Sequence, residues 1–540
     1  MLINTGRPVT MAPRAMVVSA HALASEAGVA ILQAGGHAVD AAIATSAALA
    51  VLYPHMTGVG GDAFWLIHDG ATGAISYLNA AGQAAASASM EWFQAAGMDA
   101  VPLRGVLPAT LTVPGAVDGW CTAHDRFGRL PLARVLAAAA GYARDGFPVT
   151  ARLAHHIGAC AGDHVFNGAA ATIFLPAGAP PMPGTRLTNP ALAATLEGIG
   201  EGGRQAFYEG PIAAALTRFS ATEGGFFAED DFAAQHSYWG KPLSGQYRGV
   251  TIYETPPPTQ GFAVLEMLNL LEGFDIGSWR HLGVDHVHHL VQAKQIAYND
   301  RDRLLADPRF ATVPVEQLLH PDYALSRRSL LDSARAIPWD QVPSYGSLNG
   351  NTVFTGVVDD EGNAVALIQS LYGIFGSGVV ADGTGIVLQN RSAYFSLDPE
   401  HPNHLEAGKR PAHTLIASMA KRDSRLWQVL GCMGADGQPQ IHVQAYINLI
   451  DFGLDIQQAV EAPRWLSGRF ALGEPRDLLN IEGRFDTDTL NALEGRGHQL
   501  NRWPAFEELA GHCHGITLDP VSNIRLGGAD PRSDGAAIGY

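Results

Sequence analysis

Thr352 is the residue of this 540-residue chain whose surroundings point most directly to chemistry. The preceding segment, residues 332–351, is rich in Pro, Gly, Ser and Asn, has no apolar period and predicts a mobile loop. An N-to-O acyl shift onto the Thr352 hydroxyl would cleave the Asn351–Thr352 bond and free the Thr352 α-amine. Because such an amine has a pKa of about 8, it can take the proton of the hydroxyl beside it. One residue would then supply both nucleophile and general base.

The residues after Thr352 predict the strands that must hold it. Thr352–Val358 and Ala364–Leu371 are apolar runs separated by a polar turn, which is typical of a hairpin. Because such strands are too apolar to leave one face in water, we expect an α+β fold, a single large domain in which two packed sheets are covered by helices. Further hairpins are predicted at 63–78, 415–430 and 515–526, and helices at Ser19–Gly36, Ala41–Leu52, 285–305, 440–460 and 488–498.

The composition argues against several classes of protein. Asp and Glu outnumber Lys and Arg by 52 to 35, and a formal net charge of −17 does not favour nucleic acid as a partner. No run of about 18 apolar residues could span a membrane, and the N-terminus lacks a signal-peptide pattern, so we expect a soluble cytoplasmic protein. The four cysteines are too scattered for a disulfide framework and predict buried thiols in a reducing compartment.

The histidine-rich and glycine-rich segments do not match known ligand motifs. Residues 285–289 open a helix but lack the HExxH pattern. His512 and His514 alternate along a strand and predict a hydrogen-bonded pair at the surface. Residues 58–61 lack the flanking strand and helix of a dinucleotide-binding loop. The sequence therefore predicts neither a metal ion nor a cofactor.

Motifs along nearly the whole chain resemble those of the γ-glutamyltranspeptidase family, and they occur in the family's order. They are Gly35–Ala42, Gly58–Gly61, Pro256–Gly261, Asp300–Arg303 with Asp307-Pro308, Thr352–Ser370, Phe375–Val379, Gly385–Asn390 and Gly528–Tyr540. The resemblance implies an N-terminal-nucleophile hydrolase with a four-layer αββα sandwich. It also implies a precursor cut before Thr352 into a large subunit, 1–351, and a small subunit, 352–540, which could assemble as a dimer of heterodimers.

The resemblance assigns further roles residue by residue. Ser370 lies where the family has a second hydroxyl close to the nucleophile, usually that of a Thr. Gly434 and Ala435 lie where the family has a Gly-Gly pair whose backbone N–H groups form the oxyanion hole. Backbone donors survive the change to Ala if φ permits it.

The chain departs from the family where γ-glutamyl substrates are held. Residues 79–82 contain no Arg to bind the substrate α-carboxylate, and residues 391–394 read Arg-Ser-Ala-Tyr in place of Gln-Met-Asp-Asp, whose last Asp binds the ammonium group. An unpaired buried ammonium costs a few kcal/mol. We therefore do not expect glutathione to be the substrate.

The replacing residues suggest a smaller pocket that still favours a carboxylate. Arg391 and His413, which is followed by Thr414, add hydrogen-bond donors, whereas Tyr372 and Tyr394 add bulk. Such a pocket suits a short acidic amide, although Arg391 could equally serve as a structural ion-pair partner. The patterns at residues 410–414 and 433–440 resemble the branch that contains oxamate amidohydrolase, which releases ammonia from oxamate in purine breakdown.

Three alternatives stay open. The chain could be a cephalosporin or glutaryl acylase, because that branch shares the scaffold and accepts an acyl group without an amino group. It could retain γ-glutamyl hydrolase or transferase activity. It could also be an uncleaved, non-catalytic binding protein.

The mass of the purified protein under denaturing conditions tests whether the chain is cut before Thr352. We expect two fragments that divide before Thr352, and a Thr352→Ala variant that stays whole because it has no hydroxyl for the acyl shift. A single full-length species in both proteins would mean that no free Thr352 amine exists, which would favour the binding-protein alternative.

Overall fold

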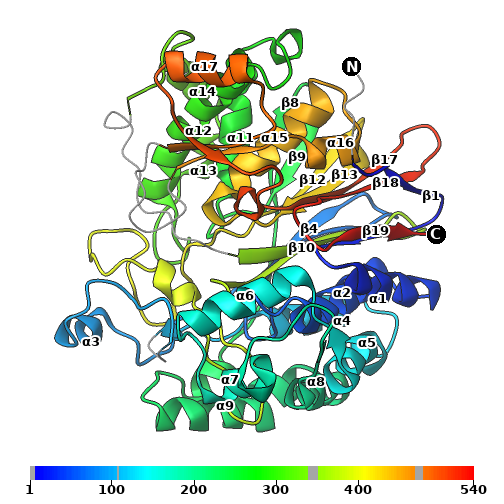
Figure 1. The fold of residues 1–540 in the computed structure, drawn as a ribbon, viewed down its shortest axis with the longest axis vertical. Helices are drawn as coiled ribbons and strands as arrows, with labels where there is room; N and C mark the ends of the chain where they lie inside the picture. Colours follow the sequence, from blue (N-terminus) through cyan, green and yellow to red (C-terminus); the bar gives the residue numbers. More distant parts are fainter. Residues whose placement is uncertain (1–5, 106–108, 339–350, 469–477) are drawn as a thin grey trace.

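Two seven-stranded antiparallel sheets form the centre of the molecule (Figure 1). The computed structural model describes residues 6–105, 109–338, 351–468 and 478–540, without the side chain of Asn351. Sheet I contains, in spatial order, β19 (Ala536–Gly539), β2 (Met16–Ser19), β10 (Asn351–Val358), β11 (Ala364–Tyr372), β3 (Asp62–His68), β4 (Ile75–Ala80) and β7 (Tyr238–Gly240). Sheet II contains β1 (Thr10–Ala12), β18 (Arg525–Ala529), β17 (Cys513–Leu518), β13 (Arg425–Cys432), β12 (Ala417–Arg422), β9 (Val250–Glu254) and β8 (Leu243–Tyr247).

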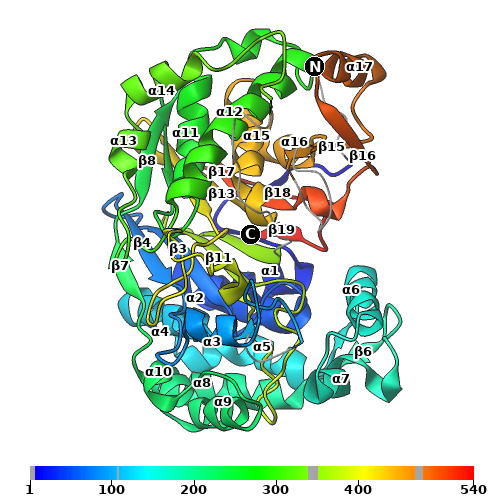
Figure 2. The same ribbon diagram turned by 90° about the vertical axis from the view of Figure 1, so that its left-hand side faces the viewer.

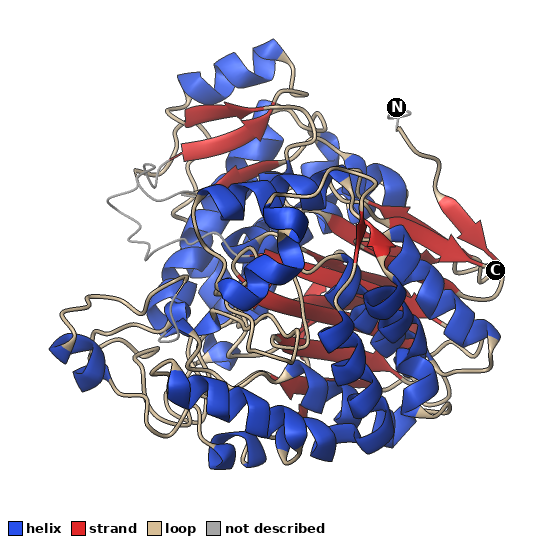
Figure 3. Ribbon diagram, turned by 60° about the horizontal axis from the view of Figure 1, so that its bottom comes forward, coloured by secondary structure: helices blue, strands red, loops and turns tan. Residues whose placement is uncertain are grey.

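Helices cover the outer face of each sheet, which completes the predicted αββα sandwich (Figures 1 and 3). The sheet I side carries α1 (Ala22–Gln33), α2 (Ala38–Leu52), α4 (Ala116–Phe127), α5 (Leu132–Asp145), α8 (Pro190–Tyr208), α9 (Pro211–Thr222) and α10 (Glu229–Ala233). The sheet II side carries α11 (Gly261–Leu271), α12 (Val284–Leu304), α13 (Val315–Leu318), α14 (Pro321–Arg328), α15 (Gln438–Ile450), α16 (Ile456–Glu461) and α17 (Thr487–Gly495).

Smaller elements lie around this sandwich. They are the helices α3 (Met90–Ala95), α6 (Ala151–Gly162) and α7 (Gly168–Phe174), the strand pair β5 (Phe147–Pro148) and β6 (Arg186–Leu187), and the sheet formed by β14 (Trp465–Ser467), β15 (Leu478–Glu482) and β16 (Gln499–Trp503). Figure 2 shows α6 and α7 at the edge of the molecule. None of the helices in the described ranges combines the length and the apolar character that a membrane span requires.

The alanine-rich helix α2 shows how the sequence builds the layer beneath sheet I. All 15 of its residues are buried, and it packs on β10 and β11. Alanine has the highest helix propensity and the smallest side chain that fills a core, so the helix can approach the sheet closely. A capping box fixes its start: the His37 backbone N–H donates to Asp40 at 2.9 Å, and His37 Nδ1 accepts from Val39 N at 3.1 Å.

Large apolar side chains fill the space between the two sheets. Phe354 of β10 and Ile368 of β11 pack in one buried cluster with Val429 of β13 and Ile516 of β17. Gly431 makes this packing possible, because a Cβ added there would lie 2.2 Å from Cδ2 of Phe354. The strand that carries Thr352 is thereby fixed against the opposite sheet.

Both parts of the chain contribute to both sheets. In sheet I, β10 and β11 from the part after residue 351 pair with β2 and β3 from the part before it. In sheet II, β12 pairs with β9 and β18 pairs with β1. Residues 1–351 and 352–540 are therefore one packing unit and not two domains. The division between the two segments stays a prediction.

The predicted hairpins are all present, with small shifts at their ends. β10 begins at Asn351, one residue earlier than predicted, and residues 339–350 of the predicted mobile loop lie outside the described residues. The predicted helix 440–460 is divided into α15 and α16, because Gly453 adopts φ +63° and Asp455 starts a new helix as its N-cap. All four cysteines are buried and free, as predicted.

The predicted surface position of His512 and His514 is wrong. Both side chains are fully buried. The error arises because sheet II is covered on both faces, so that alternation along β17 does not distinguish a solvent side. Burial lowers the pKa of His512 to about 3 and that of His514 to about 4.

Buried neutral histidines make the stability of this fold depend on pH. Burial also lowers the pKa of His286 and His498 to about 3 and that of His288 to about 4, from an ordinary value of 6.5. Below pH 6.5 the unfolded chain binds protons that the folded chain does not, so each such histidine removes about 1.4 kcal/mol of unfolding free energy per pH unit down to its folded pKa. We expect the thermal midpoint of the Thr352→Ala chain to fall steeply from pH 6.5 to 4.5. A midpoint that is constant over this range would contradict the burial of these rings.

Candidate active site

Thr352 lies at an irregular point of the β10–β11 pairing. Asn351 pairs with Tyr372 and Val353 pairs with Gln369, so Thr352 faces two residues of β11, Ser370 and Leu371. Such a bulge re-aims the side chains beside it. Thr352 is fully buried, and Nε2 of Gln438, the first residue of α15, lies 3.4 Å from its Oγ. In the structure Thr352 is joined to Asn351 within the strand.

Ser370, near the end of β11, lies close to the buried guanidinium group of Arg391. Ser370 Oγ accepts a hydrogen bond from the Tyr372 backbone N–H at 2.7 Å, and Arg391 Nη2 lies 3.5 Å from the same oxygen. Tyr372 adopts φ +76°, a left-handed conformation that costs an L-residue about 1–2 kcal/mol. The guanidinium of Arg391 stacks on its ring at 4.3 Å. The surrounding contacts must compensate for this backbone strain at Tyr372.

Arg391 is fully buried at the start of a 3₁₀ turn, Arg391–Tyr394. Its Nη1 donates to Thr414 Oγ at 3.1 Å, whereas Nε has no hydrogen-bond partner among the described residues. Within the described part of the chain, no carboxylate lies at ion-pair distance from this guanidinium, and burial lowers its pKa. Among the described residues, Arg391 therefore does not form the structural ion pair that the sequence left open. Arg391 places a guanidinium group beside Ser370 without a directly contacting carboxylate among the described residues.

His413 forms a second polar pair with a residue that the sequence analysis missed. Its Nε2 lies 3.3 Å from Oδ2 of Asp62, at the start of β3 and paired in register with Ser370. Backbone N–H groups of Gly82 and Gly115 and the side chain of Gln389 hold the other oxygen of Asp62. Burial, followed by the charge of Arg391, lowers the pKa of His413 to about 4, so the imidazole is neutral at pH 7.

Gly434 and Ala435 form the turn between β13 and α15. Their φ angles are +154° and +48°, so Ala435 adopts the left-handed conformation that a Gly would adopt without strain. Gln260 stabilises the turn by donating from Nε2 to the carbonyl oxygens of Ala435 at 3.0 Å and Thr414 at 2.7 Å. Neither N–H of the pair donates to another described residue. Both are therefore available to a ligand, as an oxyanion hole requires.

Tyr394 links this turn to the Arg391 segment. Its hydroxyl donates to Asp436 Oδ1 at 2.8 Å, and Arg301 Nη1 donates to the same oxygen at 3.0 Å. The ring of Tyr394 meets that of Tyr372 edge to face at 5.8 Å. A cavity of about 240 Å³ adjoins Tyr394 and is also lined by Asp302 and His401. The cavity is large enough for a small organic molecule.

The sequence-predicted site residues therefore form one connected network. Direct contacts join Ser370, Tyr372, Arg391, Tyr394 and Thr414. The others are linked through further residues: Thr352 contacts Gln438, His413 pairs with Asp62, and Gln260 bridges Thr414 to the Gly434-Ala435 turn. The side chain of Asn351 lies outside what the structure describes. Sequence reasoning missed Asp62, Gln260, Arg301, Asp436 and Gln438. Of these, Gln260, Arg301, Asp436 and Gln438 lie within motifs quoted from the sequence, and Asp62 directly follows one.

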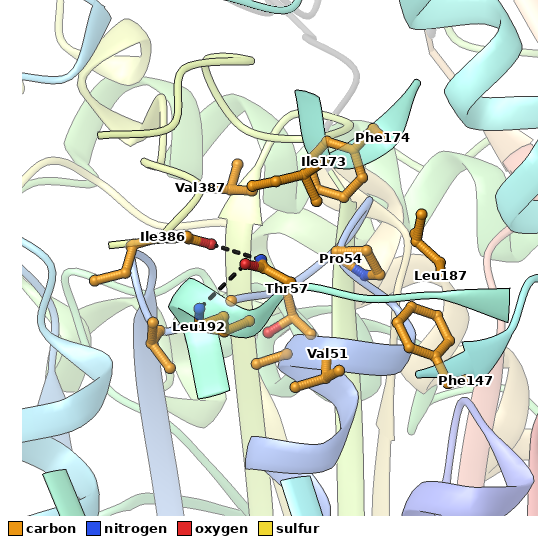
Figure 4. A pocket seen from close by; sticks show the side chains of 15 residues that line it. Val51, Pro54, Thr57, Phe147, Ile173, Phe174, Leu187, Leu192, Ile386 and Val387 are labelled. Atoms are coloured by element: carbon orange, nitrogen blue, oxygen red, sulfur yellow. Dashed lines mark hydrogen bonds between the residues drawn. The ribbon is translucent and has the colours of Figure 1, made fainter. Parts of the chain in front are cut away.

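A second, smaller cavity has no such chemistry (Figure 4). It measures about 20 Å³ and is lined mainly by apolar side chains, among them Val51, Phe147, Leu187 and Ile386. None of its lining residues is charged. It is a gap in the packing between α2 and the residues that precede α8, and it offers no acid or base.

The chain is similar to known proteins over almost its whole length. The family model described as Gamma-glutamyltranspeptidase matches residues 24–540. The chain is 41% identical to the glutathione hydrolase-like YwrD proenzyme of Bacillus subtilis and 40% identical to the oxamate amidohydrolase proenzyme of Klebsiella pneumoniae, over 97% of this chain and 98% of each relative. The crystal structure of a cephalosporin acylase from Bacillus halodurans superposes with a TM-score of 0.92 at 36% identity, covering 100% of this chain and 98% of that one.

Proposed function

The chain belongs to the gamma-glutamyltranspeptidase family, and we propose that it cleaves itself before Thr352 and then hydrolyses the amide bond of a small acidic substrate, for which oxamate is the first candidate. The proenzyme names of the relatives support processing into a large and a small subunit. The observation that carries the substrate class is the position of Arg391.

Arg391 suits an anion that lies very near the reacting carbon. It is buried, has no ion-pair partner among the described residues, and reaches Ser370, which lies across the bulge from Thr352. In oxamate the carboxylate carbon is bonded directly to the amide carbon. A carboxylate bound at Arg391 therefore places the scissile carbonyl of such a short substrate beside Thr352. A bidentate guanidinium–carboxylate pair is among the strongest polar contacts available.

The proposed reaction is an acyl transfer in two stages. Thr352 Oγ attacks the amide carbonyl, and the α-amine of Thr352, freed by the cut, accepts the hydroxyl proton. The N–H groups of Gly434 and Ala435 stabilise the oxyanion, the proton passes to the leaving nitrogen, and ammonia departs. Water then attacks the acyl-Thr352 ester, gives up its proton to the same amine, and releases oxalate and the free hydroxyl.

The contacts around His413 suit this chemistry. A neutral imidazole held by Asp62 can present one N–H or one lone pair without adding a second positive charge next to Arg391. The rings of Tyr372 and Tyr394 meet edge to face, and we infer that their bulk limits the length of the acyl group. We assign Tyr372, Arg391, Tyr394, His413 and Thr414 to substrate binding on these grounds.

Glutaryl acylase activity is the second candidate. It is favoured by the cavity of about 240 Å³ beside Tyr394, which exceeds what oxamate needs, and by the similarity to a cephalosporin acylase structure. A γ-glutamyl substrate would bring an ammonium group next to Arg391. Repulsion between these two positive charges in a buried site would weaken the binding of a γ-glutamyl substrate.

Ammonia release from oxamate, measured beside hydrolysis of glutaryl- and γ-glutamyl-p-nitroanilide, tests the proposal. The last two substrates differ only by an α-amino group, so their ratio measures the exclusion of the ammonium. We expect turnover of oxamate and the glutaryl compound to exceed that of the γ-glutamyl compound. In an Arg391→Met variant, kcat/KM for the acidic substrates should fall by about 10- to 100-fold, because a charge-assisted hydrogen bond is lost.

An Arg425→Gln variant is the matched control, because Arg425 is exposed at the far end of β13. Each variant is first shown by mass to be cut before Thr352, which separates a loss of processing from a loss of binding. Equal kcat/KM for oxamate in the wild type and in a processed Arg391→Met variant would contradict the role of Arg391. A preference for the γ-glutamyl substrate would contradict the proposed substrate class.

A further inference from the structure

A buried cluster of metal-ligating side chains lies outside the candidate active site. His55 follows the end of α2, His156 lies in α6, and Glu508 begins the 3₁₀ turn Glu508–Ala510 near the C-terminus. One donor atom from each residue lies within 4.8 Å of the other two. Three segments that are distant in the sequence thus meet at one point, beside the helix α6 labelled in Figures 1 and 2.

His55 is the unusual member of this cluster. It is completely buried, and neither Nδ1 nor Nε2 has a hydrogen-bond partner among the described residues. Buried polar atoms without a partner are rare in folded proteins, and an unseen ion or water is a common explanation. An imidazole nitrogen that makes no other contact can offer its lone pair to a metal ion.

The charges around the cluster favour a cation. Glu508 brings a carboxylate into the cluster, and 18% of its side chain is exposed. Arg152 is the only cation within ion-pair distance of Glu508 in the described part of the chain, and it is shared: its Nη1 lies 2.7 Å from Glu508 and its Nε 3.7 Å from Asp534. One guanidinium thus faces two carboxylates. Asp534 Oδ2 has no hydrogen-bond partner among the described residues.

The geometry is close to that of a coordination site. His156 Nε2 and Glu508 Oε1 are 3.1 Å apart. Two ligands at about 2.0–2.2 Å from a tetrahedral Zn²⁺ are separated by about 3.4 Å. The ring of His55 stacks on that of His156, with centroids 4.7 Å apart and planes at 22°. Because the lone pair of an imidazole nitrogen lies in the plane of its ring, the His55 ring must turn out of this stack for its nitrogen and that of His156 to meet at one ion.

We propose that His55, His156 and Glu508 bind a divalent transition-metal ion, with Zn²⁺ the best match to two imidazoles and one carboxylate. Binding requires that Nε2 of His156 be unprotonated, with its proton on Nδ1. Magnesium and calcium, which prefer oxygen ligands, do not fit this donor set.

The ion would have a structural role next to the active site. The backbone oxygen of His55 accepts from Phe375 N at 2.8 Å, and that of Met56 accepts from Leu371 N at 3.2 Å. Leu371 lies between Ser370 and Tyr372. Coordination would therefore tie α6 and the C-terminal turn to the segment that follows β11, without any contact to the reacting atoms.

Metal content of the tag-free, chelator-dialysed protein after equilibration with Zn²⁺ tests the site. We expect about one equivalent of Zn²⁺ per chain in the wild type and at least about tenfold weaker binding in His55→Gln and Glu508→Gln variants. A His288→Gln variant is the matched control, because His288 is also buried but its ring nitrogens contact His498 and the Asp332 carbonyl. This variant should bind Zn²⁺ as the wild type does.

Two results would overturn the proposal. The first is a wild-type protein that takes up less than about a tenth of an equivalent, a result that does not depend on whether any variant folds. The second is unchanged Zn²⁺ affinity in folded Glu508→Gln or in the milder Glu508→Asp variant. Co²⁺ substitution gives an independent signature: visible bands typical of nitrogen and oxygen ligands are expected, whereas a thiolate-to-cobalt band would move the site to a cysteine and contradict the assignment.

Discussion

The pairing of β10 with β2 on one side and β11 on the other is the constraint on which the site depends. These ladders, together with the packing of Phe354 against Gly431, hold β10 inside sheet I with Thr352 near its start. The same contacts would hold the two segments together after the proposed cut before Thr352. Both segments supply strands to both sheets, so a cut at residue 351 would remove one covalent bond and leave the core unchanged.

Near Thr352, several fully buried side chains are polar. Arg391, His413 and Asp62 are all fully buried, and each has at least one polar atom with no hydrogen-bond partner among the described residues. Such atoms destabilise a fold, because each loses its hydration without compensation. They are tolerated where a ligand completes their contacts. The left-handed backbone of Tyr372 and Ala435 in the same region is a further local cost of this arrangement.

Much of the fold could be predicted from the sequence, because its strands and helices carry local patterns. The apolar runs around 352–371 and the alanine-rich run 41–52 specify a hairpin and a buried helix through period and composition alone. The order of the strands could not be predicted in this way. β1 lies beside β18, more than 500 residues further along the chain, and no local pattern encodes that contact.

The candidate site likewise contains some residues that the sequence identifies and others that only the structure identifies. Residues inside family motifs, such as Thr352 and Ser370, could be named from the sequence. Asp62 could not, since it is a single polar residue at the start of an apolar strand and acquires its role only through a long-range contact with His413. Gln438 lies within the pattern 433–440, but its position beside Thr352 depends on a contact that no local pattern encodes. The burial of His512 was mispredicted for the related reason that alternation along a strand does not reveal whether the second face is covered.

The most direct test of the central claim is to trap the acyl intermediate. The enzyme is quenched in acid during turnover of a glutaryl amide, and the small subunit is mapped by tandem mass spectrometry. If Thr352 is the N-terminal nucleophile, that subunit begins at Thr352 and carries the glutaryl group on this residue. Turnover accompanied by a small subunit that begins elsewhere, or by an acyl group on a different residue, would contradict the account.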